Sequence, residues 1–492
     1  MRNVVISYLL TLTLFGCAVG PNYQRPSVET PPSWRFEEKE TKEVANTAWW
    51  EQFDDPVLNE VIQTALKENK DLQMAAVRVE EFMGRHVTTR AALFPQVGGA
   101  ASAGRGRSTE KGPAPFSSAI ENPADAYQVF LNASWEIDLW GKLRRATEAA
   151  RADLLSTEEG RRAVTLTLVT SLASAYVNLR DLDKQLDIAK RTAKGREESY
   201  SLFQIRFREG VISETELYQA KSEYEQALAT IPFLEKAIVK QENALSVLLG
   251  RNPGPIPRGK TVDELVLPAV PAGLPSDLLA NRPDIRQAEQ DLIAANARIG
   301  VAKSLYFPSI SLTGLFGSAS TDLSNLFSGP AKVWSFAAPL TAPIFTGGAI
   351  RGQVKSAKAV QQQAILRYQQ SIQASFREVE DALVDQRKSR EQLEVQARQV
   401  ESLRNYARLA RLRFDSGYTS YLEVLDAERS LFNAELSLVQ TKGVLFQALV
   451  NLYRAMGGGW VVEADRLTAV KTDSKISVHG SPASQETEGK SN

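Results

Sequence analysis

The chain has 492 residues with 58 basic and 58 acidic side chains, so its zero formal net charge gives no reason to expect a nucleic-acid partner. One cysteine excludes a disulfide framework, and two scattered histidines, His86 and His479, do not suit a transition-metal site. No nucleophile–base arrangement, phosphate-binding loop or metal cluster stands out in the sequence. We therefore expect a protein that is not an enzyme and that binds no metal.

The N-terminus reads as a lipoprotein signal peptide over residues 1–16. Arg2 precedes an apolar run from Val4 to Phe15, which is too short for a hydrocarbon core that needs about 20 residues but suits a secretory signal. Leu14-Phe15-Gly16-Cys17 resembles a bacterial lipobox, although Phe15 is bulkier than usual, and implies a covalent lipid on Cys17. Ala18 after the cysteine implies sorting to the outer membrane. An ordinary signal peptide with a chance cysteine is the alternative. No other cofactor is expected.

The rest of the chain is predicted to contain two copies of one helix–hairpin–helix–helix unit. An acylated, extended segment over 17–55 leads into the first copy, 56–250. Its expected elements are a helix from Asp55-Pro56 to about Leu93, a β-hairpin over about 96–138, a long helix from Lys142 to Gly210, and a return helix from about Ser213 to Leu249. Residues 251–282, with six prolines up to Pro275, are expected to form a linker or equatorial region.

The second copy, 283–459, repeats this order. Its expected elements are a helix from Pro283 to Leu305, a β-hairpin over about 308–345, a helix from Ala349 to Phe414, and a return helix from Ser420 to about Met456. A helix of that length would extend roughly 100 Å, which favours a coiled coil or a tube over a globular domain. Residues 460–492 are predicted to be a polar, disordered tail.

A constant sequence offset shows that the copies arose by internal duplication. Arg206-Phe207-Arg208-Glu209-Gly210 recurs 207 positions later as Arg413-Phe414-Asp415-Ser416-Gly417. Ahead of the hairpins the offset is 213, since Phe94-Pro95 matches Phe307-Pro308. The difference places six extra residues in the first hairpin, where a surface loop tolerates an insertion.

The two hairpins have the alternation of membrane-spanning strands. Apolar side chains alternate with polar ones from Tyr127 to Ile137, apart from Phe130, and again from Trp334 to Ile344. Such runs reach the 9–11 residues that a transmembrane strand needs. Four strands cannot close a barrel, so a membrane-spanning form must oligomerise: two chains would give eight strands, and three would give twelve with room for a lumen. A soluble hairpin packed on the helices remains the alternative.

Several segments resemble the TolC/OprM-type outer-membrane factors, specifically the lipoprotein branch associated with RND efflux systems. The matching segments are Cys17–Tyr23, Trp49–Pro56, Asn281–Ile285 and Tyr421–Arg429. The resemblance implies a homotrimer in which four strands per chain complete a twelve-stranded outer-membrane β-barrel, continuous with a periplasmic α-helical barrel. It also implies a periplasmic adaptor protein and an inner-membrane transporter of RND type as partners. Outer-membrane lipid would surround the barrel, and no catalysis is implied.

The resemblance also places a periplasmic gate at the helix tips. Leu422, Asp426 and Arg429 match the constriction of the family, and Asp426 and Arg429 are spaced i, i+3, so they can pair on one helical face. Around a threefold axis Asp426 would form a carboxylate ring and Leu422 an apolar ring. Ordinary interhelical packing is the alternative for Leu422.

Two further sets of residues complete the predicted site. Glu216 and Glu423 lie near the gate, but Ser213-x-x-Glu216 and Ser420-x-x-Glu423 also read as capping boxes that only start the return helices. Four glycines mark changes of direction: Gly210 and Gly417 as helix-tip turns, and Gly141 and Gly348 as the junction between β-barrel and helical barrel.

The predicted function is therefore an outer-membrane exit duct that conducts substrates passively from the transporter and adaptor. Two alternatives stay open. One is the outer-membrane duct of a type I secretion system, which resembles this fold but typically lacks the lipobox. The other is a lipid-anchored periplasmic coiled-coil scaffold that does not span the membrane.

Overall fold

The computed structural model describes residues 18–35, 48–109, 111, 121–268 and 281–457. The signal peptide expected over 1–16, the lipid expected on Cys17 and the tail expected over 460–492 lie outside these residues. The chain divides into two compact units. Unit 1 comprises the residues up to Glu29, Ala76–Glu159 and Asp284–Ser371, and unit 2 comprises Thr30–Ala75, Gly160–Pro283 and the residues from Ile372 onward.

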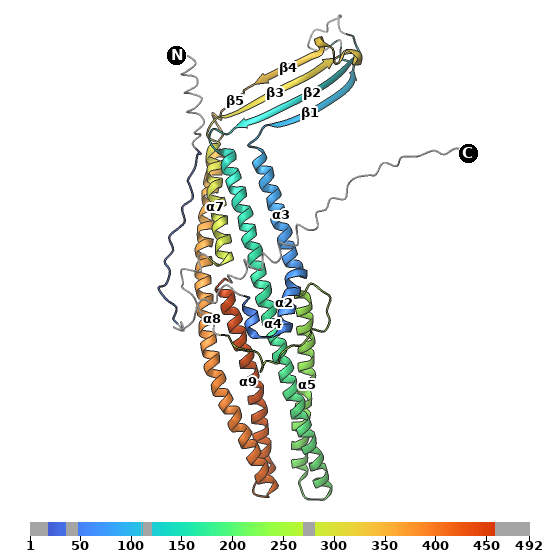
Figure 1. The fold of residues 1–492 in the computed structure, drawn as a ribbon, viewed down its shortest axis with the longest axis vertical. Helices are drawn as coiled ribbons and strands as arrows, with labels where there is room; N and C mark the ends of the chain where they lie inside the picture. The colour runs from blue at the N-terminus through green and yellow to red at the C-terminus, as the bar shows by residue number, and fades with distance from the viewer. Residues whose placement is uncertain (1–17, 36–47, 110, 112–120, 269–280, 458–492) are drawn as a thin grey trace, which may run out of the picture. The chain divides into compact units, whose positions relative to one another are not determined.

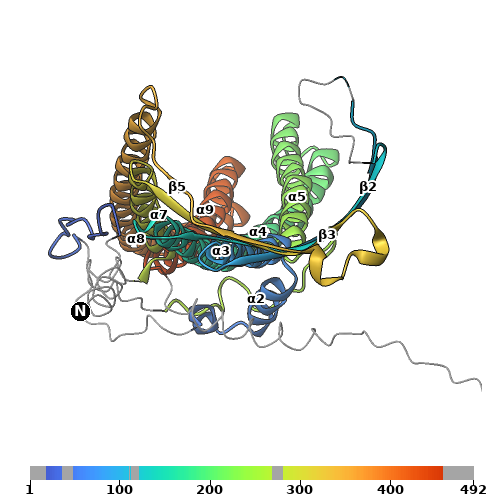
Figure 2. The same cartoon turned by 90° about the horizontal axis from the view of Figure 1, so that it is seen from above.

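Unit 1 contains one antiparallel sheet, whose strands curve along their length (Figures 1 and 2). The strands are β1 (Gln96–Gly106), β2 (Ala124–Ile137), β3 (Ser309–Ser320), β4 (Lys332–Ala337) and β5 (Leu340–Thr341); 3-10 helices η3 (Leu323–Asn325) and η4 (Gly329–Ala331) lie between β3 and β4. The order is β1-β2-β3-β4, and β5 also pairs with β3. The pairing of β2 with β3 therefore joins the two copies, and among the described strands β1 and β4 are the edges.

One face of this sheet carries large, exposed apolar side chains. Leu131 on β2 lies opposite Phe316 on β3, which lies opposite Trp334 on β4, so the three share a face. All three are exposed. The polar residues that alternate with them on β2, such as Asn132 and Ser134, point to the other face. The predicted alternation thus separates an apolar face from a polar one.

The strand predicted from Trp334 to Ile344 is shorter and is interrupted. β4 ends at Ala337, and β5 covers only Leu340–Thr341. Pro339 causes the gap, because it has no N–H to donate to the ladder. Its carbonyl still accepts from the Ser311 N–H at 3.2 Å, and the pairs Thr313–Ala337 and Ile310–Leu340 keep one register. The prediction was wrong beyond Thr341.

The first predicted helix, from Asp55 to about Leu93, is also broken in two. Helix α2 (Pro56–Glu68) and helix α3 (Lys70–Ala91) are separated at Asn69, whose ψ of 130° is extended. The buried Asn69 side chain accepts from the Leu72 N–H at 3.0 Å, and its amide donates to the Leu248 carbonyl at 2.9 Å. Asn69 is therefore the N-cap of α3 and ties it to the end of the first return helix.

The long helices match one another in length across the copies (Figure 1). Helix α4 (Lys142–Arg208) and helix α8 (Ala349–Asp415) each have 67 residues, and the return helices α5 (Glu214–Leu248) and α9 (Tyr421–Ala455) each have 35. Helix α3 and its counterpart α7 (Pro283–Ser304) each have 22. The fold class predicted from the sequence, a duplicated strand-hairpin and long-helix unit, is confirmed. Among the described residues, no helix has the length and apolar content needed to cross a membrane.

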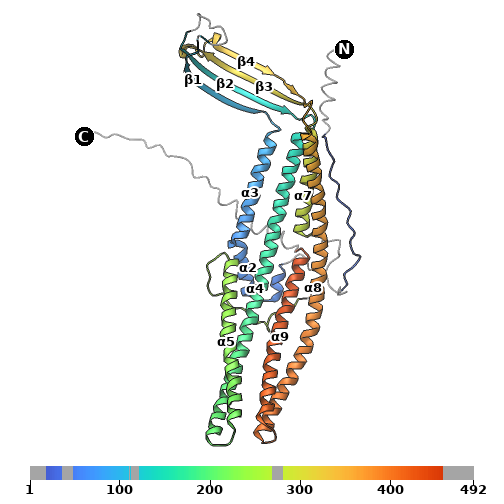
Figure 3. The ribbon, with the colours of Figure 1, turned by 180° about the vertical axis from the view of Figure 1, so that it is seen from behind.

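Unit 2 contains two helical hairpins, which we call the first hairpin (the unit 2 part of α4, with α5) and the second hairpin (the unit 2 part of α8, with α9). Both are visible in Figure 3. Their core is centred on the 3-10 helix η1 (Trp49–Phe53): Trp49 is fully buried and stacks on Tyr453 of α9 with ring centroids 4.8 Å apart. Asp55 caps α2 and also accepts from the Tyr176 hydroxyl and the Lys260 N–H, both at 3.1 Å. These contacts fix the described part of the predicted linker against α4.

An extended segment, 18–25, packs on the helices of unit 1. The Val19 N–H donates to the Trp140 carbonyl at 2.9 Å, and the Tyr23 hydroxyl donates to Glu289 at 2.9 Å. Gly20 and Gly300 allow the segment to touch α7 closely, since a Cβ built on Gly20 would lie 2.5 Å from the Gly300 Cα. The segment that follows Cys17 is thus fixed along α7 by contacts that only small residues permit.

Candidate functional site

The two helix-tip glycines adopt the same left-handed turn. Gly210 has φ +74° and Gly417 has φ +79°. At the first tip the Val211 N–H donates to the Arg206 carbonyl, and at the second the Tyr418 N–H donates to the Arg413 carbonyl, both at 2.9 Å. Gly210 and Gly417 also donate to the carbonyls three positions earlier, both at 3.0 Å, so each tip is a Schellman motif. The duplication has kept the turn geometry.

An aromatic cluster joins the two hairpins next to these turns. Phe203 of α4 lies 4.0 Å from Tyr421 of α9 and 6.1 Å from Phe414 of α8, measured between ring centroids. Phe203 and Tyr421 are buried. We did not predict this cluster from the sequence, because Phe203 has no aromatic counterpart 207 positions later, where Ala410 stands.

The predicted gate residues share one exposed stripe of α9. Arg429 Nη2 donates to Asp426 Oδ1 at 2.9 Å, and each side chain is 52% exposed. An exposed pair of this kind contributes about 0–1 kcal/mol. Leu422, one turn earlier, is 61% exposed, so the described chain gives it no interior packing. The i, i+3 pairing within one chain occurs as the spacing indicates.

The two predicted capping boxes behave differently. Ser213 and Glu216 form a complete box, with the Ser213 N–H donating to Glu216 Oε2 at 2.8 Å and the Glu216 N–H donating to Ser213 Oγ at 3.3 Å. Ser420 makes no such side-chain bond, so the second prediction is wrong. The Glu423 carboxylate instead accepts from Arg413 at 2.7 Å and from the Thr419 hydroxyl. Glu423 therefore ties α9 to the end of α8.

The junction glycines also adopt positive φ, +77° at Gly141 and +87° at Gly348, where the chain leaves the sheet and enters a long helix. A Cβ on Gly141 would lie 2.8 Å from the Ala18 Cα, so the residue also makes room for the N-terminal segment. Asp138 caps the helix that follows, accepting from the Arg144 N–H at 2.9 Å. Gly348 has open space around it and is required for its backbone conformation only.

The sequence model of the outer membrane efflux proteins matches residues 61–251 and 274–458, one match for each copy. The chain belongs to this family. It is 36% identical over 473 residues to the toluene efflux pump outer membrane protein TtgF of Pseudomonas putida, covering 94% of this chain and 98% of that one. It is also 36% identical over 465 residues to the cation efflux system protein CusC of Escherichia coli, covering 93% and 98%.

The crystal structure of the open state of the outer membrane channel MtrE of Neisseria gonorrhoeae has the same fold. It superposes with a TM-score of 0.82 at 32% identity and covers 90% of this chain and 99% of that one. The resemblance predicted from the sequence is confirmed. This family member is an outer-membrane efflux channel protein with a large periplasmic helical part, and it belongs to a family of ducts, not of enzymes.

Proposed function

We propose that three copies of this chain form a closed twelve-stranded β-barrel that continues into a helical barrel, and that this assembly is the exit duct of a tripartite efflux pump. The observation that carries the proposal is the open sheet with one apolar face. In lipid, the edges β1 and β4 would leave backbone groups unsatisfied at several kcal/mol each. Pairing β1 of one copy with β4 of the next removes both edges, and three copies leave a lumen.

The partners in this proposal are a periplasmic adaptor and an inner-membrane transporter of the RND class. The relatives carry names that refer to toluene and to cations, which are chemically very different solutes. That range supports a passive duct that accepts whatever its transporter delivers. The adaptor would contact the helix tips, where the family's gate residues are found.

In the resting state the stripe formed by Leu422, Asp426 and Arg429 is proposed to be the gate. Three copies around an axis would bring their exposed Asp426–Arg429 pairs and Leu422 side chains together. The carboxylates would then form a ring that attracts cations and can pair with Arg429 of a neighbour, and the leucines would form a ring that can dewet. The exposure of all three side chains in the single chain supports this, because exposed side chains are accessible to a neighbouring copy.

Planar-bilayer conductance of purified wild-type protein beside Asp426→Ala tests both parts. We expect a small wild-type current and a larger one in the variant. The matched control is Asp415→Ala, which removes another exposed carboxylate near the tip, paired with Arg411 at 3.6 Å on α8, and should leave the current unchanged. Intact trimers that never insert would refute the duct. Insertion with equal currents in wild type and Asp426→Ala would remove Asp426 from the gate.

Covalent lipid on Cys17 is a separate proposal. It is supported by the lipobox-like sequence and by Ala18, which is held against Gly141 at the start of α4. Labelling cells with a palmitate analogue should mark the wild-type protein and leave Cys17→Ser unmarked. Equal labelling of the two proteins would refute the assignment.

A further inference from the structure

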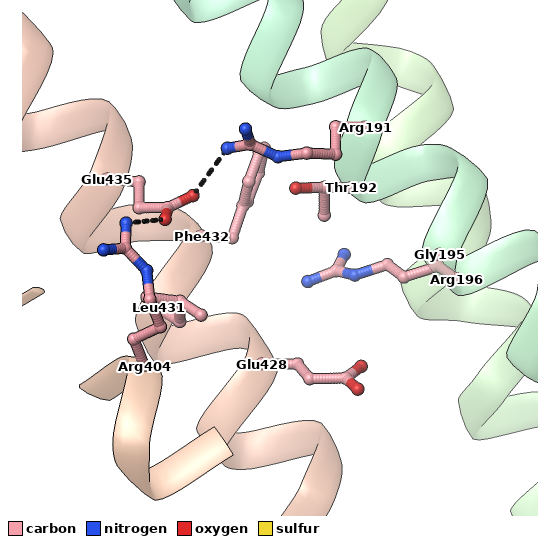
Figure 4. Close-up of a pocket in the computed structure, with 9 residues that line it drawn as sticks. All are labelled: Arg191, Thr192, Gly195, Arg196, Arg404, Glu428, Leu431, Phe432 and Glu435. Atoms are coloured by element: carbon pink, nitrogen blue, oxygen red, sulfur yellow. Dashed lines mark hydrogen bonds and ion pairs between the residues drawn. The ribbon is translucent and has the colours of Figure 1, made fainter. Parts of the chain in front are cut away.

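A cavity of about 410 Å³ lies within unit 2, where α4 of the first hairpin faces α8 and α9 of the second (Figure 4). Its charged lining consists of three arginines and two glutamates: Arg191, Arg196, Arg404, Glu428 and Glu435. Charged side chains between helices influence how the helices are held, because burying a charge is costly unless it is paired and hydrogen-bonded. The pairing around this cavity therefore indicates what joins the hairpins above the tips.

Glu435 is bonded to both hairpins at once. Its carboxylate, 13% exposed, accepts from Arg404 of α8 at 2.7 Å and from Arg191 of α4 at 3.2 Å. The first ion pair lies within the second hairpin, and the second crosses from one hairpin to the other. Figure 4 shows the two guanidinium groups reaching Glu435 from different helices. Glu435 thus has one partner within its own hairpin and one that links the two hairpins.

Arg196, which lines the same cavity, also contacts both hairpins. Its buried guanidinium donates to the Glu223 carbonyl of α5 at 2.7 Å, and it lies 5.4 Å from the Phe432 ring centroid on α9. Burial lowers the pKa of Arg196, and the Glu223 carboxylate, 3.0 Å away, opposes that effect. Arg196 is therefore fixed by the first hairpin and offers its charge to an aromatic face of the second.

Resting on the gate proposed above, we propose that Arg191 is a positioning residue for it: the Arg191–Glu435 ion pair ties α9 to α4 and holds Asp426 and Arg429 in the closed arrangement. Glu435 lies six residues after Arg429 on the same helix, about 9 Å along its axis. Over so short a distance an α-helix moves as a rigid body. Release of α9 at Glu435 therefore moves the gate stripe with it.

The test compares Arg191→Gln, which removes the cross-hairpin pair, with Arg404→Gln, which removes only the pair within the second hairpin. The assembled, full-length protein is used throughout. One readout is bilayer current, and the other is the distance between spin labels on the tips of α5 and α9. We expect Arg191→Gln to raise the open-to-closed ratio by up to about fivefold per chain, the range for a partly exposed ion pair, and to broaden the label distances. Arg404→Gln should change neither.

Two further variants keep the outcome interpretable. Arg191→Lys retains a cation on α4 and should therefore restore wild-type behaviour. If Arg191 acted only by packing its side chain, the lysine variant would not restore it. Asp426→Ala reports on the gate independently. If Asp426→Ala conducts while Arg191→Gln matches wild type in both current and label distance, the gate stands and the tie is refuted. If no variant conducts, the gate fails and the labels decide: broadened distances in Arg191→Gln support the tie, and unchanged distances overturn it.

Discussion

Asp181 provides the sharpest quantitative prediction. This α4 carboxylate is 7% exposed, and its Oδ2 accepts from Gln185 at 3.1 Å. Its Oδ1 has no hydrogen-bond partner among the described residues, and Gly443 of α9 lies opposite, where an added Cβ would be 3.2 Å from the Asp181 Cγ. Burial raises the pKa of Asp181 from 3.8 to about 6, although the Gln185 hydrogen bond opposes the shift. The folded protein therefore favours the protonated form of Asp181 more strongly than the unfolded chain does.

The size and sign of the effect follow from this shift. Because the folded pKa is raised, the unfolded state loses its proton first as pH rises, and the charged group destabilises the fold. Above pH 6 the penalty is about 3 kcal/mol per chain, from roughly two pKa units at about 1.4 kcal/mol each. Between pH 6 and pH 4 it falls to below about 1 kcal/mol. Asp181→Asn removes the charge at every pH and should therefore stabilise the protein most above pH 6.

The assay is the thermal midpoint of wild type and Asp181→Asn across pH 4 to 8 in the same detergent. The quantity of interest is the difference between the two proteins at each pH, which cancels the titration of all other groups. Asp385→Asn, an exposed aspartate on α8, is the matched control and should give a flat difference. A difference for Asp181→Asn that is equally flat, or that grows toward acid pH, would show that the burial argument is wrong.

Three further predictions concern backbone positions. Gly417→Ala should lower the free energy of unfolding by about 1–2 kcal/mol, because Gly417 has a positive φ. The control Gly352→Ala, in open space within α8, should be neutral or stabilising in thermal unfolding. Equal effects of the two substitutions would contradict this. Asn69→Ala should cost about 0.5–2 kcal/mol by removing the α3 cap, and an unchanged midpoint would argue against it. Gly300→Ala would place a Cβ 2.6 Å from the Val19 carbonyl oxygen, so limited proteolysis should cut the N-terminal segment faster than in wild type.

The repeated sequence made the helices predictable. Because the two copies are related by an offset of 207, the helix pattern in one copy supports the prediction of a helix in the other. The observed helix α8, Ala349–Asp415, ends one residue beyond the predicted end at Phe414. Helix-tip glycines are equally readable, because a left-handed C-terminal turn strongly prefers glycine. The Asp426–Arg429 pair was predictable because i, i+3 neighbours on a helix are always close.

Interactions between distant parts of the chain were not predictable. The break at Asn69 depends on the Leu248 carbonyl, 179 positions away, which accepts a hydrogen bond from the Asn69 side-chain amide. This bond stabilises the extended backbone that separates α2 from α3. The failed cap at Ser420 depends on Arg413 reaching Glu423 from the preceding helix. Asp181 gave no signal at all, because an aspartate inside an amphipathic helix looks solvent-facing until its neighbours are known. Each of these errors is a tertiary contact that overrides a sound local rule.

The duplication also explains why the proposed gate lies in the second copy. The positions equivalent to Leu422, Asp426 and Arg429 in the first copy are Thr215, Gln219 and Ser222, which are polar but uncharged. Both copies keep the same tip turn and the same helix lengths, so the backbone scaffold is shared. Of these six positions, only the three on α9 carry an apolar side chain and a pair of opposite charges. In the proposed duct, the second copy would supply the constriction on the axis and the first copy the wall that supports it, both from one duplicated fold.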